Sequence, residues 1–372
     1  MSIPEAFNPS RLTLARKRRG LTMTRLAEAI GVEPRSVSAY EKGEFSPDVE
    51  KREQLAAVLR LPASFFCGDD LDELSPDSAS FRALSRMTAA QRDMALGAGA
   101  IALLLNKWIE ERFDLPKAGL PDLSREGHPE AAADSMRRSW GLGELPIKSM
   151  VHLLESKGVR VFSLSLDAAE VDAFSMWHEN TPFIFLNTMK SAEHSRFDAA
   201  HELGHLIMHR HGPPQGLDAE RDANTFASAF LMPRASVLAQ APRLATVDHL
   251  IRLKKYWTVS VAALAYRLHT AGILTDWHYR TLCIEMASRG YRRREPDEAQ
   301  RETSQVLAKV FSALRDENVA KRDIAEQLHI TAEEIEQLVF GLTLTGLTGL
   351  PRPEGSTTAK RGHLRTAKPK HD

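Results

Sequence analysis

The sequence has few cysteines, no long apolar run and no net charge. Its 372 residues include only Cys67 and Cys283, which are far apart and belong to no CxxC pattern. The cysteines therefore indicate neither a disulfide framework nor a cysteine-based zinc site. The longest apolar run, residues 94–105, has 12 residues, too few to span a bilayer, and the N-terminus lacks an apolar signal core. We expect a cytoplasmic protein without a membrane partner.

Charge is balanced over the whole chain, with 49 basic and 49 acidic residues. A charged partner can therefore be inferred only from local clusters of charge. Basic residues gather at 16–19 and again in the tail beyond residue 355. The tail has almost nothing to bury, so residues 351–372 are predicted to be disordered. An apolar fraction of 43% is ordinary for packed domains, and the length fits two or three of them.

Hydrophobic spacing predicts mostly helices with one small sheet. Five short helices fit residues 9–62, a polar linker covers 68–78, and one long helix spans 88–113. Two more helices fit 129–154. The period then changes to two, which predicts strands at 159–162, 171–177 and 183–186 in an antiparallel sheet. Helices follow at 191–208 and 217–232, the second ended by Pro233, with short helices over 247–288 and a last pair at 323–329 and 331–342.

The strongest chemical signal is an HExxH sequence, His201-Glu202-Leu203-Gly204-His205. Histidines four residues apart lie on one face of a helix, so both imidazoles can bind one ion. Glu202 lies beside them and can act as the general base of a zinc peptidase. A purely structural zinc is the alternative, but such sites favour cysteine, and it would give Glu202 no role. His209 and His211 are expected to cap or solvate the helix end.

A catalytic zinc needs a third protein ligand and one open position. Glu220 is the candidate, since it begins a second helix that can cross the first. Asp222 competes with it but points elsewhere on that helix. Asn224 shares the face of Glu220 and is expected to orient a ligand histidine. The expected cofactor is one Zn²⁺ per chain.

Residues 11–47 contain a helix-turn-helix pattern. Thr22 can cap the first helix, Gly31 permits the turn and Pro34 opens the second helix. Arg35 is the side chain best suited to guanine edges. Residues 16–19 offer further phosphate contacts. The alternative is a helical domain used only for dimerisation or protein contacts. The expected partner is double-stranded operator DNA, and the candidate contacts are Arg35, Ser36, Ser38, Ala39, Arg25 and Thr22.

These two motifs resemble two known families. The HExxH sequence, the segment from Glu220 to Ala227 and the later Leu231-Met232-Pro233 resemble the ImmA/IrrE metallopeptidases. That resemblance implies zinc ligands at His201, His205 and Glu220 and a catalytic Glu202. Residues 11–47 resemble the Cro/C1-type (XRE) helix-turn-helix domain, although Met23 stands where that family commonly has a glutamine. The pair at 323–342 is also similar, but Glu333, Glu334 and Glu336 would repel phosphate, so we interpret it as a packing or dimerisation element.

The expected fold is therefore multidomain and mainly α. A helix-turn-helix domain spans 1–68, a helical linker region 69–125, an α+β zincin-like peptidase domain 126–290, a helical region 291–350 and the basic tail 351–372. We expect a homodimeric transcription regulator whose endopeptidase cleaves a repressor, an antitoxin-like partner or itself. The resemblance also suggests stress, phage or mobile-element regulation. The alternative is a transcription factor whose peptidase-like domain senses a ligand or partner without cleaving it.

Overall fold

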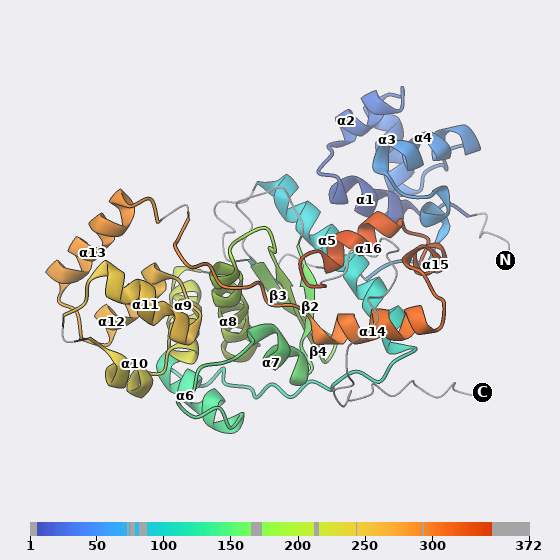
Figure 1. The fold of residues 1–372 in the computed structure, drawn as a ribbon. Helices are drawn as coiled ribbons and strands as arrows, with labels where there is room; N and C mark the ends of the chain where they lie inside the picture. Colours follow the sequence, from blue (N-terminus) through green and yellow to red (C-terminus); the bar gives the residue numbers. More distant parts are fainter. Residues whose placement is uncertain are drawn as a thin grey trace.

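The computed structural model describes residues 6–72, 74, 79–81, 88–164, 173–211, 216–242, 244–291 and 294–343. The predicted disordered tail, 351–372, lies outside these residues, as does the predicted strand start at 171–172. Within the described part, helices surround one small sheet (Figure 1). The mainly α, multidomain fold class is confirmed.

The N-terminal unit contains four α-helices within the predicted range 9–62 and a 3₁₀ helix at 63–67, so the fifth helix lies just beyond that range. Thr22 accepts a hydrogen bond from the Arg25 amide, and Asp48 accepts one from the Lys51 amide, so both side chains cap helices. Gly31, with a φ of 66°, makes the turn between the second and third helices. The elements are α1 (Pro9–Arg18), α2 (Met23–Ala29), α3 (Pro34–Lys42), α4 (Val49–Leu59) and η1 (Ala63–Cys67).

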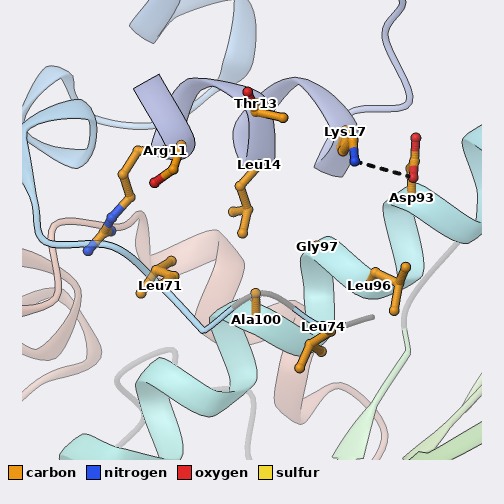
Figure 2. A pocket seen from close by; sticks show the side chains of 11 residues that line it. Arg11, Thr13, Leu14, Lys17, Leu71, Leu74, Asp93, Leu96, Gly97 and Ala100 are labelled. Carbon is orange, nitrogen blue, oxygen red and sulfur yellow. Dashed lines mark ion pairs between the residues drawn. The ribbon is translucent and has the colours of Figure 1, made fainter. Parts of the chain in front are cut away.

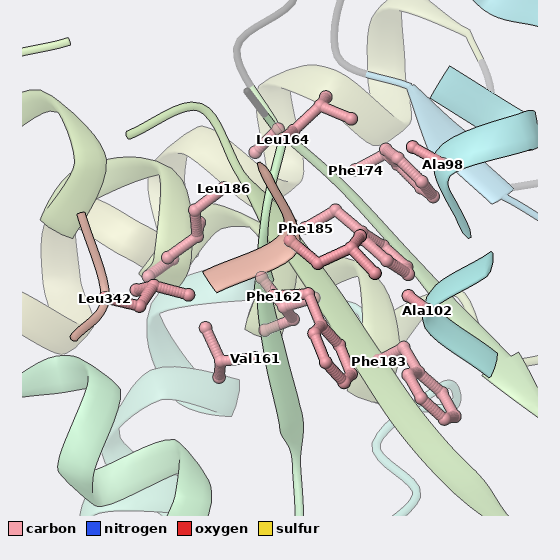
Figure 3. Close-up of a cluster of buried hydrophobic side chains, with 14 of the residues drawn as sticks. Ala98, Ala102, Val161, Phe162, Leu164, Phe174, Phe183, Phe185, Leu186 and Leu342 are labelled. Carbon is pink, nitrogen blue, oxygen red and sulfur yellow. The ribbon is translucent and has the colours of Figure 1, made fainter. Parts of the chain in front are cut away.

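The long helix α5 (Ala89–Glu110) connects this unit to the sheet (Figure 1). It begins with a capping box between Thr88 and Gln91. On one side it packs against α1, and Gly97 permits the close approach because a Cβ there would lie 3.0 Å from the Arg18 backbone. On its other side the small side chains Ala98 and Ala102 meet the phenylalanines of the sheet (Figure 3).

The sheet has four strands in the order β1-β3-β4-β2, namely β1 (Ala79–Phe81), β2 (Arg160–Ser163), β3 (Ala173–His178) and β4 (Thr181–Leu186). The antiparallel prediction is correct for β1–β3 and β3–β4 but wrong for β2–β4, which are parallel. The reason is the two-residue turn at 179–180. It returns the chain from β3 directly into β4, which then lies between β3 and β2. The sheet is therefore mixed.

The two faces of the sheet have different partners. Phe162, Phe174, Phe183 and Phe185 are fully buried and stack with one another on the face toward α5 (Figure 3). Strand alternation turns the intervening residues to the opposite face. Helix α8 (Ala192–Met208) packs there, against β3 and β4.

Helix α9 (Leu217–Leu231) crosses α8 closely. Gly204 permits this contact, since a Cβ there would lie 3.0 Å from the Phe226 ring. Pro233 follows α9, as predicted, and Trp257 is fully buried. The surrounding helices are α6 (Pro129–Ser139), α7 (Met150–Ser156), α10 (Arg234–Gln240), α11 (Val247–Trp257), α12 (Val261–Thr270) and α13 (Asp276–Ser288).

The C-terminal helices return to the N-terminal unit (Figure 1). They are α14 (Gln305–Asp316), α15 (Lys321–Gln327) and α16 (Ala332–Val339). Helix α16 packs against α5 and β2, and its Glu334 forms ion pairs with Arg18 and Arg19 of the N-terminal unit. Helix α16 thus packs inside the protein, which agrees with packing, one of the two roles predicted for this helical pair. Among the helices of the described residues, none has the length and apolar character needed to cross a membrane.

Candidate functional site

Three side chains that could hold a metal ion converge where α8 and α9 cross. His201 and His205 lie one turn apart on α8, and their Nε2 atoms are 3.0 Å apart. Glu220, in the first turn of α9, brings Oε2 to 3.5 Å from His201 Nε2 and Oε1 to 3.3 Å from His205 Nε2. The three side chains thus surround one point from two helices.

These distances fit a zinc ion. Zinc ligands at about 2.0–2.1 Å in tetrahedral geometry lie roughly 3.3–3.4 Å from one another. The three separations between the ligand atoms are 3.0, 3.5 and 3.3 Å, which lie close to that value. Within the described residues, His201, His205 and Glu220 form the metal-ligand group, and neither Asp222 nor His211 belongs to it. The donor set therefore matches a three-ligand zinc centre built on Glu220 rather than on Asp222.

Burial and charge keep the Glu220 carboxylate ionised. Burial alone raises the pKa of Glu220, but the contacts with His201 and His205 outweigh it and lower this pKa to about 2. An ionised carboxylate is the form that binds a metal. Glu220 is therefore ready to act as a ligand near neutral pH.

The two histidines of the candidate metal centre are oriented by neighbouring side chains. Asn224 Oδ1 lies 3.2 Å from His201 Nδ1, the contact expected from the helix face that Asn224 shares with Glu220. His209 Nδ1 lies 3.0 Å from His205 Nδ1. Burial, followed by the charge of His205, lowers the pKa of His209 to about 4, so His209 is neutral and its Nδ1 can accept a hydrogen bond from His205 Nδ1–H. Both contacts favour Nε2 as the metal-binding atom.

His209 is the C-cap residue of α8, as expected, and it also forms a contact with His205 that was not predicted. The sequence contained a signal for it, because His209 follows His205 by four residues and lies on the same helix face. His211, by contrast, is exposed and contacts Asp122 at 2.7 Å.

Glu202 lies inside the HExxH turn and is held from the sheet. Its side chain is fully buried, and its Oε2 accepts a hydrogen bond of 2.7 Å from Ser175 Oγ on β3. Trp177, two residues along the same strand, donates from Nε1 to the Leu206 carbonyl at 3.0 Å. Strand β3 thus holds α8 in place next to Glu202 and restrains the Glu202 carboxylate. Sequence analysis did not identify Ser175, because its distance from Glu202 in the chain gives no local signal.

A cavity of about 460 Å³ opens beside the metal-ligand group. Glu220 and Asn224 contribute to its wall, together with the apolar side chains of Phe197, Leu217 and Tyr266. The cavity offers an apolar recess next to the third ligand.

The predicted DNA-contacting residues occupy a different, exposed surface. The Arg35 side chain is 85% exposed and pairs with Glu33 at 3.0 Å. Thr22 and Arg25 are also exposed, whereas Ser36 and Ser38 are half-buried. Ala39 is buried in the domain core, so its predicted outward position is wrong. The physical reason is that Ala39 lies beside Tyr40 on the side of α3 that packs inward.

The basic run at 16–19 is largely used inside the protein. Arg16 binds Glu41 through two hydrogen bonds of 2.6 and 2.9 Å. Arg18 and Arg19 both meet the buried carboxylate of Glu334. The expectation that this run supplies phosphate contacts is therefore wrong for these three arginines, since internal carboxylates already neutralise them.

The fold and the two sites define a helix-turn-helix protein with a metallopeptidase-like domain. Residues 12–66 match the helix-turn-helix family, and residues 154–269 match the family described as IrrE N-terminal-like domain. The chain therefore combines these two domains, in the arrangement that its motifs predict. A search of curated proteins finds no match to this chain.

Proposed function

We propose that this transcription regulator is a zinc-dependent endopeptidase that hydrolyses a peptide bond in a regulatory protein. A repressor, an antitoxin-like partner or a second copy of this chain is the proposed substrate. The observation that carries the proposal is the metal-ligand group of His201, His205 and Glu220 next to a buried Glu202. This geometry provides three ligands and a general base while leaving one position open for chemistry.

The chemistry follows from the positions of the side chains. A zinc ion held by this group would supply an activated water and polarise the peptide carbonyl. Glu202 lies beside the two ligand histidines, so its carboxylate can take the proton of the attacking water. The same carboxyl group can then return that proton to the leaving amine. Ser175 holds Glu202 Oε2 and so positions the base.

The helix-turn-helix domain gives the proposed peptidase a regulatory setting. We propose that it binds operator DNA as a homodimer in the cytoplasm, with Arg35 reading base edges and with Thr22, Arg25, Ser36 and Ser38 as further DNA contacts. The domain boundaries at 68, 125, 290 and 350 belong to this proposal, as does a role in stress, phage or mobile-element regulation. Light scattering with and without an operator duplex tests the dimer.

The peptidase activity is tested on proteins encoded beside the gene and on the protein itself. We expect new N-termini, detected by mass spectrometry, after incubation with zinc-loaded protein. Chelated protein should produce none, and restoring zinc should bring them back. Cleavage that persists after complete zinc removal would overturn the zinc mechanism.

A non-cleaving sensor is the second candidate function. It is favoured by one observation, the complete burial of His201 and Glu202. A sensor would bind zinc yet cleave none of the candidate proteins, and its affinity for operator DNA would change with the bound partner.

A further inference from the structure

The second edge of strand β3 is covered by β1, a short strand in the linker region 69–125 that follows the helix-turn-helix domain. Strand β3 pairs with β4 along Ala173–His178 on one side. On the other side it pairs antiparallel with β1, the short strand Ala79–Phe81, with Ser80 opposite Ser175. Without β1, the outer amides and carbonyls of β3 would form an open edge of the kind that accepts an extended peptide.

The covered edge lies next to the catalytic acid. Ser175, the register partner of Ser80, is the residue whose hydroxyl donates to Glu202 Oε2 at 2.7 Å. Strand β1 therefore pairs with β3 at Ser175, the β3 residue whose side chain is hydrogen-bonded to Glu202. An extended substrate pairing with β3 at this level would place its backbone at the same point.

The site is also closed to a large substrate. His201 and Glu202 are fully buried, and His205 is 3% exposed. The neighbouring 460 Å³ cavity reaches Glu220 and Asn224 but includes neither histidine nor Glu202 in its wall. A peptide bond can reach the centre only after a covering segment moves.

Two described residues of the linker, Asp72 and Leu74, contact the rest of the protein. Asp72 Oδ2 lies 3.2 Å from His178 Nε2 at the end of β3. Leu74 packs directly on α5, where a Cβ on Gly99 would come within 2.4 Å of its Cδ1. Leu71 and Leu74 also line a cavity of about 360 Å³ between α1 and α5 (Figure 2). β1 itself pairs over only three residues, so it can be displaced without unfolding the sheet.

We propose that residues 79–81 occupy the place of an extended peptide substrate along β3, which makes the linker from the helix-turn-helix domain an internal inhibitor of the peptidase site. This inference rests on the proposed function and specifies its substrate as an extended segment that pairs antiparallel with β3. This linker follows η1, the last helix of the DNA-binding unit. A movement of that unit would therefore change the access of substrate to the peptidase site.

The test compares two substitutions at one position. Ser80→Pro removes the backbone donor and disrupts pairing, whereas Ser80→Ala keeps it. Both are made in a Glu202→Gln background so that a bound peptide is not cleaved. The probe is a fluorescent peptide with the sequence of residues 76–84, and binding is followed by anisotropy. We expect Ser80→Pro to bind it at least about tenfold more tightly than Ser80→Ala, a difference of about 1.4 kcal/mol.

Equal peptide binding by the two variants would overturn the proposal. Hydrogen exchange gives a second readout, in which the β3 amides should exchange faster in Ser80→Pro than in Ser80→Ala. If Ser80→Pro does not fold, Leu74→Ala replaces it and should also admit the peptide more readily than wild type. A lack of cleavage by wild-type zinc protein would count against the proposed function alone, because these readouts need no hydrolysis.

Discussion

The proposed metal centre and the proposed DNA-reading surface around Arg35 differ in how much of their geometry is fixed before a partner binds. At the metal centre, His201 and Glu202 are fully buried, and the ligand atoms are separated by 3.0–3.5 Å. On the DNA-reading surface, Arg35 is 85% exposed and is held only by a surface contact with Glu33. Chemistry that needs fixed geometry thus lies on packed helices, whereas DNA contacts are completed by the DNA itself.

The largest expected effect is at the base of the proposed peptidase. Glu202→Gln keeps the size of the side chain and its contact with Ser175 but cannot accept the proton. We expect cleavage to slow by about 10²–10⁴-fold. Zinc content, measured by atomic absorption, should stay at the wild-type level. A variant that cleaves at the wild-type rate would remove Glu202 from the mechanism.

The next effect concerns the contact between the N-terminal unit and α16. Glu334 is 1% exposed, lies 3.1 Å from Arg18 Nη2, and forms a second ion pair with Arg19 at 2.7 Å. Burial lowers the pKa of Arg18, so this guanidinium depends on the carboxylate. Glu334→Ala should lower the free energy of unfolding by about 3–5 kcal/mol in urea titrations.

Glu336→Ala is the matched control for this prediction. Glu336 lies on the same helix but is 59% exposed, and it is 3.5 Å from Lys321. Its loss should cost about 0–1 kcal/mol. Similar losses for the two variants would mean that burial does not distinguish these carboxylates.

The DNA-reading surface should respond through specificity rather than stability. Arg35→Ala should weaken binding to the preferred operator by about 1–3 kcal/mol and relax preference at one base position. Thermal unfolding should be unchanged, since the side chain is exposed. Binding measured over an operator library checks this. Uniform weakening across all sequences would assign Arg35 to the backbone instead.

The smallest predicted effect concerns the outer contacts of the metal centre. Asn224→Ala removes the 3.2 Å contact with His201 Nδ1. We expect zinc affinity to fall by about 10–100-fold, because the histidine loses its orientation. Competition with a fluorescent chelator measures this change. Thr225→Ala, one residue along α9, is the control and should leave the affinity unchanged.

The sequence predicts those features that depend on local spacing. The two histidines on one face of α8, the long helix that starts near residue 88 and the end of α9 at Pro233 all follow from neighbouring residues. Glu220 could be chosen over Asp222 because helix periodicity separates their faces. The same reasoning failed for Ala39, since the rotation of a short helix depends on what packs against it.

Features that depend on contacts between distant segments could not be predicted. Strand β1 has three residues in a linker, and only its pairing with β3 reveals it. Ser175 reaches Glu202 from another strand, and Glu334 meets Arg18 from the other end of the chain. Each contact is set by tertiary packing, about which local propensity contains no information.

The most direct test of the account is the zinc content of three purified proteins. Wild type should contain about one zinc per chain, and Asp222→Ala should match it, because Asp222 lies outside the ligand group. Glu220→Ala should lose most of its zinc after dialysis while keeping its helical circular dichroism. Full zinc retention by Glu220→Ala, or zinc loss by Asp222→Ala alone, would contradict the three-ligand centre on which the proposed function depends.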